Sequence, residues 1–384
     1  MKPPIRNALL VMAGACSSAG FASAAGAIPC TAVPVAVPSP PLQVQTVASG
    51  LANPWGLVFL PNGRMLVTER AGRLRLIDAN GQISPPISGV PAVHGSGQGG
   101  LLDIALAPDF ADSRLVYLSY SEPGPGRTSG TAVLRAVLDV DKLALSNSAV
   151  IFRQKPKVTG DGHYGSRLVF ARDGALFVTV GERQQFSPAQ DLGQHHGKVV
   201  RILPSGAVPP DNPFVKTPGA QPEIWSLGHR NPQGAALNPA SGELWISEHG
   251  AMGGDEINIA QAGRNYGWPI ISYGRHYGGG KIGEGTEKPG LEQPRCYWDP
   301  SIAPGNIAFY TGNRVAQWRG NLFVTALKDQ SLVRLTLDGA RISGYEKLLP
   351  DLDKRLRDVR QGPDGWLYLL TDSSRGEVLR VQLR

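Results

Sequence analysis

Short apolar segments alternate with turns rich in Gly, Pro, Asp and Asn along most of the chain. One unit recurs six times: an apolar strand, a turn, and a second strand that ends in Thr, Ser or an acidic residue. The six copies are Leu57–Glu69, Ile104–Tyr120, Leu168–Glu182, Ala235–Glu248, Ile307–Leu327 and Val359–Asp372. Turn residues between two apolar runs predict a β-hairpin for each copy.

Several hairpins continue into a further apolar segment, at Arg73–Ile77, Val133–Leu138, Leu332–Leu337 and Val378–Leu383. Three or four antiparallel strands per unit, repeated radially, are typical of propeller blades. The sequence therefore predicts an all-β fold, a six-bladed β-propeller of four-stranded antiparallel blades. A β-sandwich is the alternative, but a sandwich does not repeat one hairpin signature six times.

The composition is typical of a protein with many short strands, and it argues against nucleic-acid binding and against a transmembrane segment. The 384 residues include 48 Gly and 32 Pro, and only 18% are charged. The net charge of +7 is spread along the chain, whereas nucleic-acid binding predicts basic blocks with interleaved aromatic residues. No apolar run beyond the first thirty residues reaches the ~18 residues needed to cross a bilayer. We therefore expect neither a nucleic-acid partner nor a transmembrane segment.

The amino terminus has the pattern of a secretory signal peptide: Lys2 and Arg6, an apolar and small-residue stretch, then Ala22–Ala27. We expect a signal peptide over 1–27, a Pro-rich arm over 28–41 and the propeller domain over 42–384. Removal of Lys2 and Arg6 lowers the net charge from +7 to +5. The expected location is periplasmic or secreted. Lipoprotein anchoring at Cys16 is a second interpretation, although the usual Leu three residues earlier is absent.

Two cysteines remain after cleavage, Cys30 and Cys296. Export implies an oxidising compartment, and two cysteines allow one intramolecular pair. We expect a disulfide that pins the arm to the insertion between the fourth and fifth hairpins. The alternative is that a terminal arm frays and both thiols stay free.

His163 stands just before the third hairpin and is a candidate general base, because the ordinary pKa of histidine lies near neutrality. Glu182 ends the same hairpin, so its carboxylate could lie beside the imidazole and orient it. The alternative is a histidine that only caps a strand. His94, His195 and His196 are rivals, and we expect the last two to lie in a solvated loop.

Cations precede or follow several strands that should meet at one mouth of the central channel. Arg230 and Asn231 precede the fourth hairpin, Lys328 follows the fifth, and Arg355 and Arg357 lead into the sixth. Alternate residues of an extended segment face the same way, so Arg355 and Arg357 should point together. Four converging cations predict a small polyanionic ligand, although Arg230–Asn231 alone could be a polar turn.

The segment Glu248–Asn258 is acidic and Gly-rich. Carboxylate and backbone oxygens at flexible geometry suit Ca²⁺, although the spacing is not that of an EF-hand. An ordinary surface loop is equally compatible with the spacing.

Seven motifs in one order give a resemblance that no single motif carries. They are Gln98–Asp103 (QGGLLD), Asp161–Gly165 (DGHYG), Gly228–Gly234 (GHRNPQG), Gly254–Asn258 (GDEIN), Asn265–Pro269 (NYGWP), Asp299–Pro304 (DPSIAP) and Arg355–Val359 (RLRDV). Over residues 42–384 the chain resembles the soluble quinoprotein sugar dehydrogenases of the glucose/sorbosone dehydrogenase family, and is most similar to its aldose sugar dehydrogenase branch.

The resemblance implies a propeller that holds pyrroloquinoline quinone (PQQ) and Ca²⁺ and oxidises aldoses at C1 to lactones. His163 then stands at the position of the general base, with Glu182 beside it and Arg230 near the reacting quinone oxygen. The positions that would bind the cofactor are Gln98, His163, Arg230, Asn231, Ser301, Lys328, Arg355 and Arg357. Two departures from the family pattern are Ala251, where some members have Pro, and Glu182, where glucose-specific members have Asp.

The resemblance also implies two calcium sites. The backbone carbonyls of Gly250 and Ala251 would hold the ion beside the cofactor, and Glu256 with the Tyr266 carbonyl would hold a structural ion. Electrons would leave to an external acceptor that the sequence does not identify, and a monomer is the expected state. The alternatives are a calcium-dependent propeller hydrolase of the lactonase type and a propeller that binds a glycan or protein without catalysis.

Overall fold

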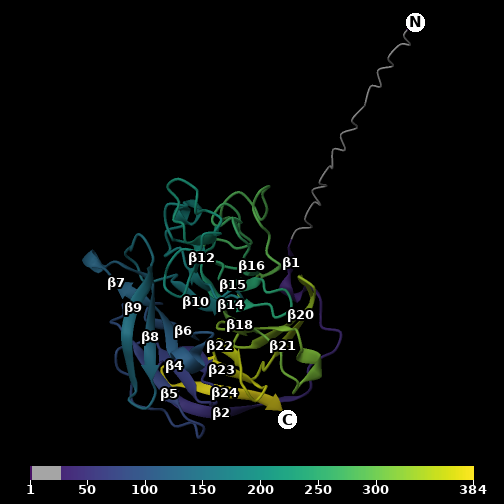
Figure 1. Ribbon diagram of the computed structural model, residues 1–384. Coiled ribbons are helices and arrows are strands. Elements are labelled where there is room, and N and C mark those ends of the chain that lie inside the picture. The colour runs from purple at the N-terminus through teal and green to yellow at the C-terminus, as the bar shows by residue number, and fades with distance from the viewer. Residues whose placement is uncertain (2–26) are drawn as a thin grey trace.

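The computed structural model describes Met1 and residues 27–384, and it contains six β-sheets arranged around one axis (Figure 1). The predicted six-bladed β-propeller is confirmed. Each predicted hairpin supplies the innermost and second strands of one sheet. The innermost strands are β3 (Pro54–Phe59), β6 (Leu101–Leu106), β10 (Gly165–Phe170), β14 (Pro232–Leu237), β18 (Pro304–Phe309) and β22 (Leu356–Gln361). Neighbouring inner strands contact one another all the way round, β22 with β3 included, so the ring is closed.

The remaining strands complete the blades outward. The second strands are β4 (Met65–Glu69), β7 (Leu115–Pro123), β11 (Leu176–Val180), β15 (Leu244–Glu248), β19 (Leu322–Ala326) and β23 (Leu367–Thr371). The third are β5 (Arg73–Ile77), β8 (Ser129–Asp139), β12 (Lys198–Ile202), β16 (Asp255–Ile259), β20 (Leu332–Asp338) and β24 (Gly376–Leu383). The outer strands are β9 (Ala144–Arg153), β13 (Ile224–Leu227), β17 (Cys296–Trp298), β21 (Arg341–Leu348) and β2 (Leu42–Leu51). Helical structure in the described residues is limited to α1 (Phe110–Ser113) and the 3-10 turns Cys30–Ala32, Pro125–Arg127, Ser187–Gln190 and Ala316–Trp318.

Two blades depart from the expected four strands. The first blade has three, β3, β4 and β5, and the fourth blade has five, because β1 (Ile28–Pro29) adds to its edge in parallel with β17. The sixth blade takes its outer strand from the other end of the chain: β2 pairs antiparallel with β24, from Leu42 opposite Leu383 to Leu51 opposite Gly376. Figure 1 shows the purple β2 beside the yellow β24. The two ends of the ring are thus joined by a continuous strand ladder.

The arm that precedes β2 is tied down at several points. Cys30 and Cys296 form a disulfide, which confirms the predicted pairing. Further along, both carboxylate oxygens of Glu346 accept hydrogen bonds from Ser39, and the guanidinium of Arg334 donates to the Val37 carbonyl. The expected signal peptide and Cys16 lie outside the described residues, apart from Met1 and Ala27. Among residues 27–384, no helix is long and apolar enough to cross a membrane.

In four blades, a hydroxyl on the second strand, at the Thr or Ser of the repeat, joins one blade to the next. Four such hydroxyls donate to a carbonyl on the inner strand of the following blade: Thr68 to Leu102, Ser119 to Ser166, Thr179 to Pro232 and Ser247 to Gly305. Apolar clusters fill the space between blades, as where Val178 of β11 packs with Tyr117 of β7. The repeated Thr or Ser is therefore part of the contact between blades.

Buried charged side chains close the middle of the central channel. The Arg167 guanidinium lies 2.9 Å from Asp103 and 3.6 Å from Asp358, and Arg360 contacts the same two carboxylates at 3.0 and 3.2 Å. Asn306 donates to Asp358 at 2.6 Å. Because two cations face two anions, this cluster is electrically balanced.

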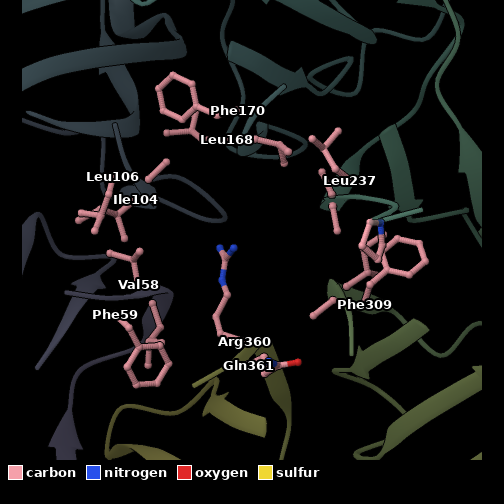
Figure 2. A pocket seen from close by; sticks show the side chains of 18 of the residues that line it. Val58, Phe59, Ile104, Leu106, Leu168, Phe170, Leu237, Phe309, Arg360 and Gln361 are labelled. Carbon is pink, nitrogen blue, oxygen red and sulfur yellow. The ribbon is translucent and has the colours of Figure 1, made fainter. Parts of the chain in front are cut away.

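The mouth at the carboxyl ends of the inner strands is an apolar basin of about 530 Å³. Figure 2 shows its lining, with the Arg360 side chain reaching toward the middle of a ring of apolar side chains. The ring includes Phe59, Leu106, Phe170, Leu237 and Phe309, which occupy equivalent positions in the repeat. None of the predicted site residues lines this basin, so the candidate chemistry belongs to the opposite mouth.

Candidate active site

The predicted site residues gather at the mouth where the inner strands begin. His163 precedes β10, Arg230 and Asn231 precede β14, and Arg357 is the second residue of β22. Gln98 precedes β6, Ser301 precedes β18, and Glu182 follows β11. The propeller brings these segments together because equivalent ends of all blades surround the same end of the channel.

His163 is held in a defined orientation. Its backbone has φ of 53°, its backbone N–H donates to Gln98 Oε1 at 2.8 Å, and the residue is 6% exposed. The imidazole Nδ1 lies 2.5 Å from Glu182 Oε1. A carboxylate only accepts, so Nδ1 carries the proton and Nε2 keeps a lone pair. The imidazole therefore presents a basic nitrogen away from Glu182.

Hydrogen bonds hold both the side chain and the backbone of Glu182. Its second carboxylate oxygen accepts the Phe186 N–H at 2.8 Å, and its own backbone N–H donates to the Arg230 carbonyl at 2.9 Å. The side chain is fully buried. Glu182 thus lies where the hairpin predicted, beside the imidazole.

The surroundings favour a neutral His163. Burial lowers the pKa of the imidazole, and the positive charges of Arg230 and Arg183 lower it further, against the opposing effect of the Glu182 carboxylate. The net shift is downward. A base must be unprotonated to act, so a lowered pKa extends its working range toward acid pH.

Arg230 is buried and lies over the Trp268 ring at 5.2 Å. Its guanidinium donates to the carbonyls of His249, at 3.0 Å, and of Gly250. The neighbouring Asn231 uses its side-chain oxygen to accept the Gly165 N–H at 3.1 Å, and so fixes the start of β10. This pair is therefore more than a polar turn.

The other predicted cations divide into buried and exposed groups. Arg357 is 6% exposed and lies 3.0 Å from Asp372, and Arg355 contacts the same carboxylate at 3.3 Å. The two arginines therefore point together, as the alternation predicted. Arg355 is half exposed and Lys328 is exposed, so the two lie toward solvent.

The ring of His249 reveals how closely the charges converge. Burial lowers the pKa of His249 well below its usual value, and Arg357, Arg230 and His163 lower it further in that order. The charges of three predicted site residues thus affect the pKa of this one imidazole. Its Nε2, the Arg230 Nε and the Arg357 Nε are shielded from solvent and have no partner among the described residues. The Nε atoms of several arginines elsewhere in the described residues, among them Arg64, Arg135 and Arg380, are shielded in the same way, so these atoms alone do not mark a ligand site.

A pair of carboxylates lies beside this cluster. Glu248 and Glu256 both accept hydrogen bonds from Asn258 Nδ2, at 2.8 and 3.0 Å, and border a cavity of about 20 Å³ that Tyr266 also lines. Burial, and then the charge of Glu248, raise the pKa of Glu256. Within the part of the chain that the structure describes, no three His, Cys, Asp or Glu side chains gather to hold a metal ion, so a cation here would also need backbone oxygens.

The segment expected to hold the cofactor-side calcium is ordered by internal contacts. Ser301 Oγ accepts the Gly253 N–H at 3.0 Å and lies 3.4 Å from the Ala251 carbonyl. The Gly250 carbonyl is the one that Arg230 contacts. The two backbone oxygens named for calcium are thus bonded to Arg230 and Ser301.

The prediction that His195 and His196 lie in a solvated loop is wrong, because both are fully buried. They precede β12 directly, and His195 Nδ1 accepts the Lys155 N–H at 3.0 Å while its ring packs against Phe152. Burial here lowers the pKa of His196 to about 4. The third rival, His94, lies 2.8 Å from Asp161.

Sequence reasoning missed three members of the cluster: His249, Asp372 and Arg183. Asp372 ends the sixth hairpin in the place where Glu182 ends the third. The repeat alone therefore could have predicted that Asp372 lies at the same mouth as Glu182. His249 and Arg183 each follow directly after an acidic hairpin end, Glu248 and Glu182. Residues that directly follow each hairpin are therefore candidates for this mouth of the channel.

Known proteins resemble this chain over most of its length. Residues 51–380 match the family model for glucose/sorbosone dehydrogenases. The chain is 48% identical to the aldose sugar dehydrogenase YliI of Escherichia coli, over 89% of this chain and 93% of that protein. It is 27% identical to quinoprotein glucose dehydrogenase B of Acinetobacter calcoaceticus, over 86% of this chain and 85% of that protein.

A solved structure shares the fold with a ligand in place. The PQQ-bound form of aldose sugar dehydrogenase from Streptomyces coelicolor superposes with a TM-score of 0.73 at 30% identity, covering 90% of this chain and 100% of that one.

Proposed function

The chain belongs to the glucose/sorbosone dehydrogenase family, and we propose that it is a PQQ- and calcium-dependent dehydrogenase that oxidises the C1 hydroxyl of aldoses to lactones. The observation that carries the proposal is the pair His163–Glu182 beside buried arginines. The relatives, an aldose sugar dehydrogenase and a quinoprotein glucose dehydrogenase, support the substrate class and the cofactor.

The residues at this mouth fit a polyanionic quinone. PQQ carries three carboxylates, and four cationic side chains at this mouth could pair with them, those of Arg230, Lys328, Arg355 and Arg357. Arginine forks suit carboxylates. The buried side of the cofactor would be held by Arg230, Asn231 and Arg357. Its outer edge would be held by the more exposed residues, Gln98, Ser301, Lys328 and Arg355.

When bound, the quinone supplies a two-electron acceptor for the hydride of C1, and calcium polarises it. His163 Nε2 would take the proton of the C1 hydroxyl, since Nδ1 is engaged with Glu182. Glu182 would hold the tautomer and stabilise the imidazolium that forms. The guanidinium of Arg230 would stabilise negative charge that develops in the transition state.

We assign the calcium ions to the places that the resemblance indicates. The cavity beside Glu248 and Glu256 brings two carboxylates to the edge of a space large enough for one ion or water, and their mutual repulsion favours a cation. The Tyr266 carbonyl would complete part of that structural site. Beside the cofactor, the carbonyls of Gly250 and Ala251 would bind the second ion once Arg230 turns toward the quinone.

Other parts of the proposal follow from export. The Cys30–Cys296 disulfide supports a periplasmic or secreted location, because such bonds persist in oxidising compartments. An external carrier would accept the electrons, and we expect the enzyme to act as a monomer.

Reconstitution tests the function. Purified protein freed of metal and quinone is mixed with PQQ, Ca²⁺, glucose and a redox dye, and each component is left out in turn. We expect dye reduction only with all components, and a loss of about 10²–10⁴ in turnover for His163→Ala. Lactone hydrolysis without PQQ would favour a hydrolase, and glycan binding without turnover would favour a binding protein. Full turnover without quinone would refute the assignment.

A further inference from the structure

Arg183 follows Glu182 and is buried, with 1% of the residue exposed. Its guanidinium donates to the carbonyls of Gly162 at 2.8 Å, Ser129 at 2.6 Å and Gly160. It also donates to the Tyr164 hydroxyl at 3.0 Å and lies over the Tyr164 ring at 3.9 Å. One side chain therefore binds the residues on both sides of His163.

The backbone adds a further link, because the Arg183 N–H donates to the His163 carbonyl at 3.2 Å. His163 has φ of 53°, and Gly160 in the same loop has φ of 92°. A residue other than glycine keeps a left-handed conformation only where its surroundings hold it. The Arg183 contacts hold this loop together with Gln98, which accepts the His163 N–H and donates its own N–H to the Asp161 carbonyl.

Among the buried arginines of the described residues, Arg183 and Arg230 are the two whose guanidinium contacts no carboxylate. Arg167, Arg334 and Arg357 each contact a carboxylate, of Asp103, Glu346 and Asp372 respectively. The described residues place no carboxylate within ion-pair distance of Arg183, whose hydrogen-bond partners are carbonyls and hydroxyls. A buried charge without a counterion is costly, and such costs are concentrated at functional sites.

We infer that Arg183 is a positioning residue for the base of the proposed reaction: it clamps the 160–164 loop around His163 and directs an unpaired positive charge at the imidazole. The inference rests on the proposed function for the role of His163, but the clamp itself rests on the contacts above. Because only 1% of Arg183 is exposed, it offers substrate and cofactor no accessible surface.

The charged and titratable groups that face the imidazole are Glu182, Arg183, Arg230 and His249. Glu182 raises the pKa of His163, and the two arginines lower it. Removal of the Arg183 charge should therefore raise this pKa, and exposure of a loosened loop to water acts in the same direction. Since the base acts when neutral, the acid limb of activity should move to higher pH.

Two substitutions separate the clamp from the charge. Arg183→Lys keeps the positive charge at acid pH but loses the planar fork that reaches several carbonyls at once. Arg183→Met removes both. Arg334→Met and Arg334→Lys serve as matched controls, because Arg334 is equally buried and hydrogen-bonded but lies at the arm, next to Ser39 and Val37.

The first measurements use protein free of quinone and metal. Histidine-labelled protein is titrated by NMR, with the His163 signal assigned from His163→Gln among the seven histidines of the chain. We expect the titration midpoint to rise in both variants, because both loosen the loop, and to rise further in Arg183→Met, which also loses the positive charge. Hydrogen exchange over residues 159–165 should be faster in both variants and unchanged in the Arg334 variants.

The reconstituted enzyme supplies the second measurement. Both Arg183 variants should lose about 10- to 100-fold in kcat, typical of a misplaced catalytic group, with KM little changed because the side chain does not contact substrate. The acid limb should move to higher pH in both variants, and further in Arg183→Met than in Arg183→Lys. Wild-type exchange over 159–165 together with a wild-type His163 midpoint in Arg183→Met would overturn the inference. If reconstitution gave no turnover, the proposed function would fail while the NMR and exchange results still decided the clamp.

Discussion

Replacement of Glu182 by Gln should show how much the orientation of His163 matters. The carboxylate accepts the Nδ1 proton at 2.5 Å and the Phe186 N–H at 2.8 Å. A hydrogen bond to a charged group is worth about 1.5–3 kcal/mol, which corresponds to roughly 10- to 150-fold in rate. The amide can also turn its NH₂ toward Nδ1, and this forces the proton onto Nε2 and removes the base. A wrong tautomer costs up to about 10⁴ in serine proteases, so we expect a loss of about 10²–10⁴ in kcat.

The pH dependence gives this prediction a sign. The hydrogen bond and charge of Glu182 raise the pKa of His163 against the effect of burial. Without them the pKa falls further, so the residual activity of Glu182→Gln should keep its acid limb at lower pH than the wild type. Stopped-flow dye reduction from pH 4 to 8 at saturating PQQ and Ca²⁺ measures both quantities. Glu346→Gln, which alters a carboxylate at the arm, is the control. Wild-type kcat, or a limb displaced to higher pH, would refute the proposed role of Glu182.

Three further predictions address the cofactor, the calcium and the disulfide. Arg357→Met should weaken PQQ binding in fluorescence titrations by about 1.5–3 kcal/mol, and Lys328→Met by less because water screens an exposed ammonium; equal effects would contradict the burial difference. Burial and the charge of Glu248 raise the pKa of Glu256 from 4.5 to about 8. Metal-free protein should therefore lose stability as the pH rises between these two values. Ca²⁺ should restore the melting temperature of the wild type but not that of Glu256→Gln. Cys30→Ser with Cys296→Ser should lower the free energy of unfolding by up to about 4–5 kcal/mol in non-reducing denaturant titrations, and an unchanged midpoint would mean that the arm holds without the bond.

The sequence was sufficient for the parts of the fold that are local. Each hairpin has its strands, its turn and its closing hydroxyl within one short stretch, so the six copies and several third strands could be identified directly. Closure of the ring could not, because β2 pairs with β24 across almost the whole chain. The parallel addition of Ile28–Pro29 to β17 has the same cause, since two residues carry no detectable strand pattern.

The site residues, too, could be predicted where they depend on local sequence and could not where they depend on long-range contacts. His163 and Glu182 could be paired in advance because they flank one hairpin, in which Gly165 lies opposite Val180. His195 and His196 were misjudged because the polarity of a segment does not reveal that it folds back under a loop. Contacts such as those of Arg183 depend on carbonyl positions, which no residue pattern encodes.

The position after the repeated hydroxyl connects the architecture with the chemistry. In the first blade, Glu69 follows Thr68 and accepts the Ala52 N–H at 2.6 Å, a purely structural contact at the mouth. In the fourth blade, Glu248 follows Ser247 and accepts the Arg230 N–H at 2.9 Å. In the third blade the acid stands slightly later, at Glu182, where it reaches the imidazole. Because the hydroxyl fixes each second strand against the next blade, an acid placed just beyond it is held rigidly at the mouth. Such a position can change from bracing a neighbouring segment to orienting a base by a shift of two residues, without any change in the ring that supports it.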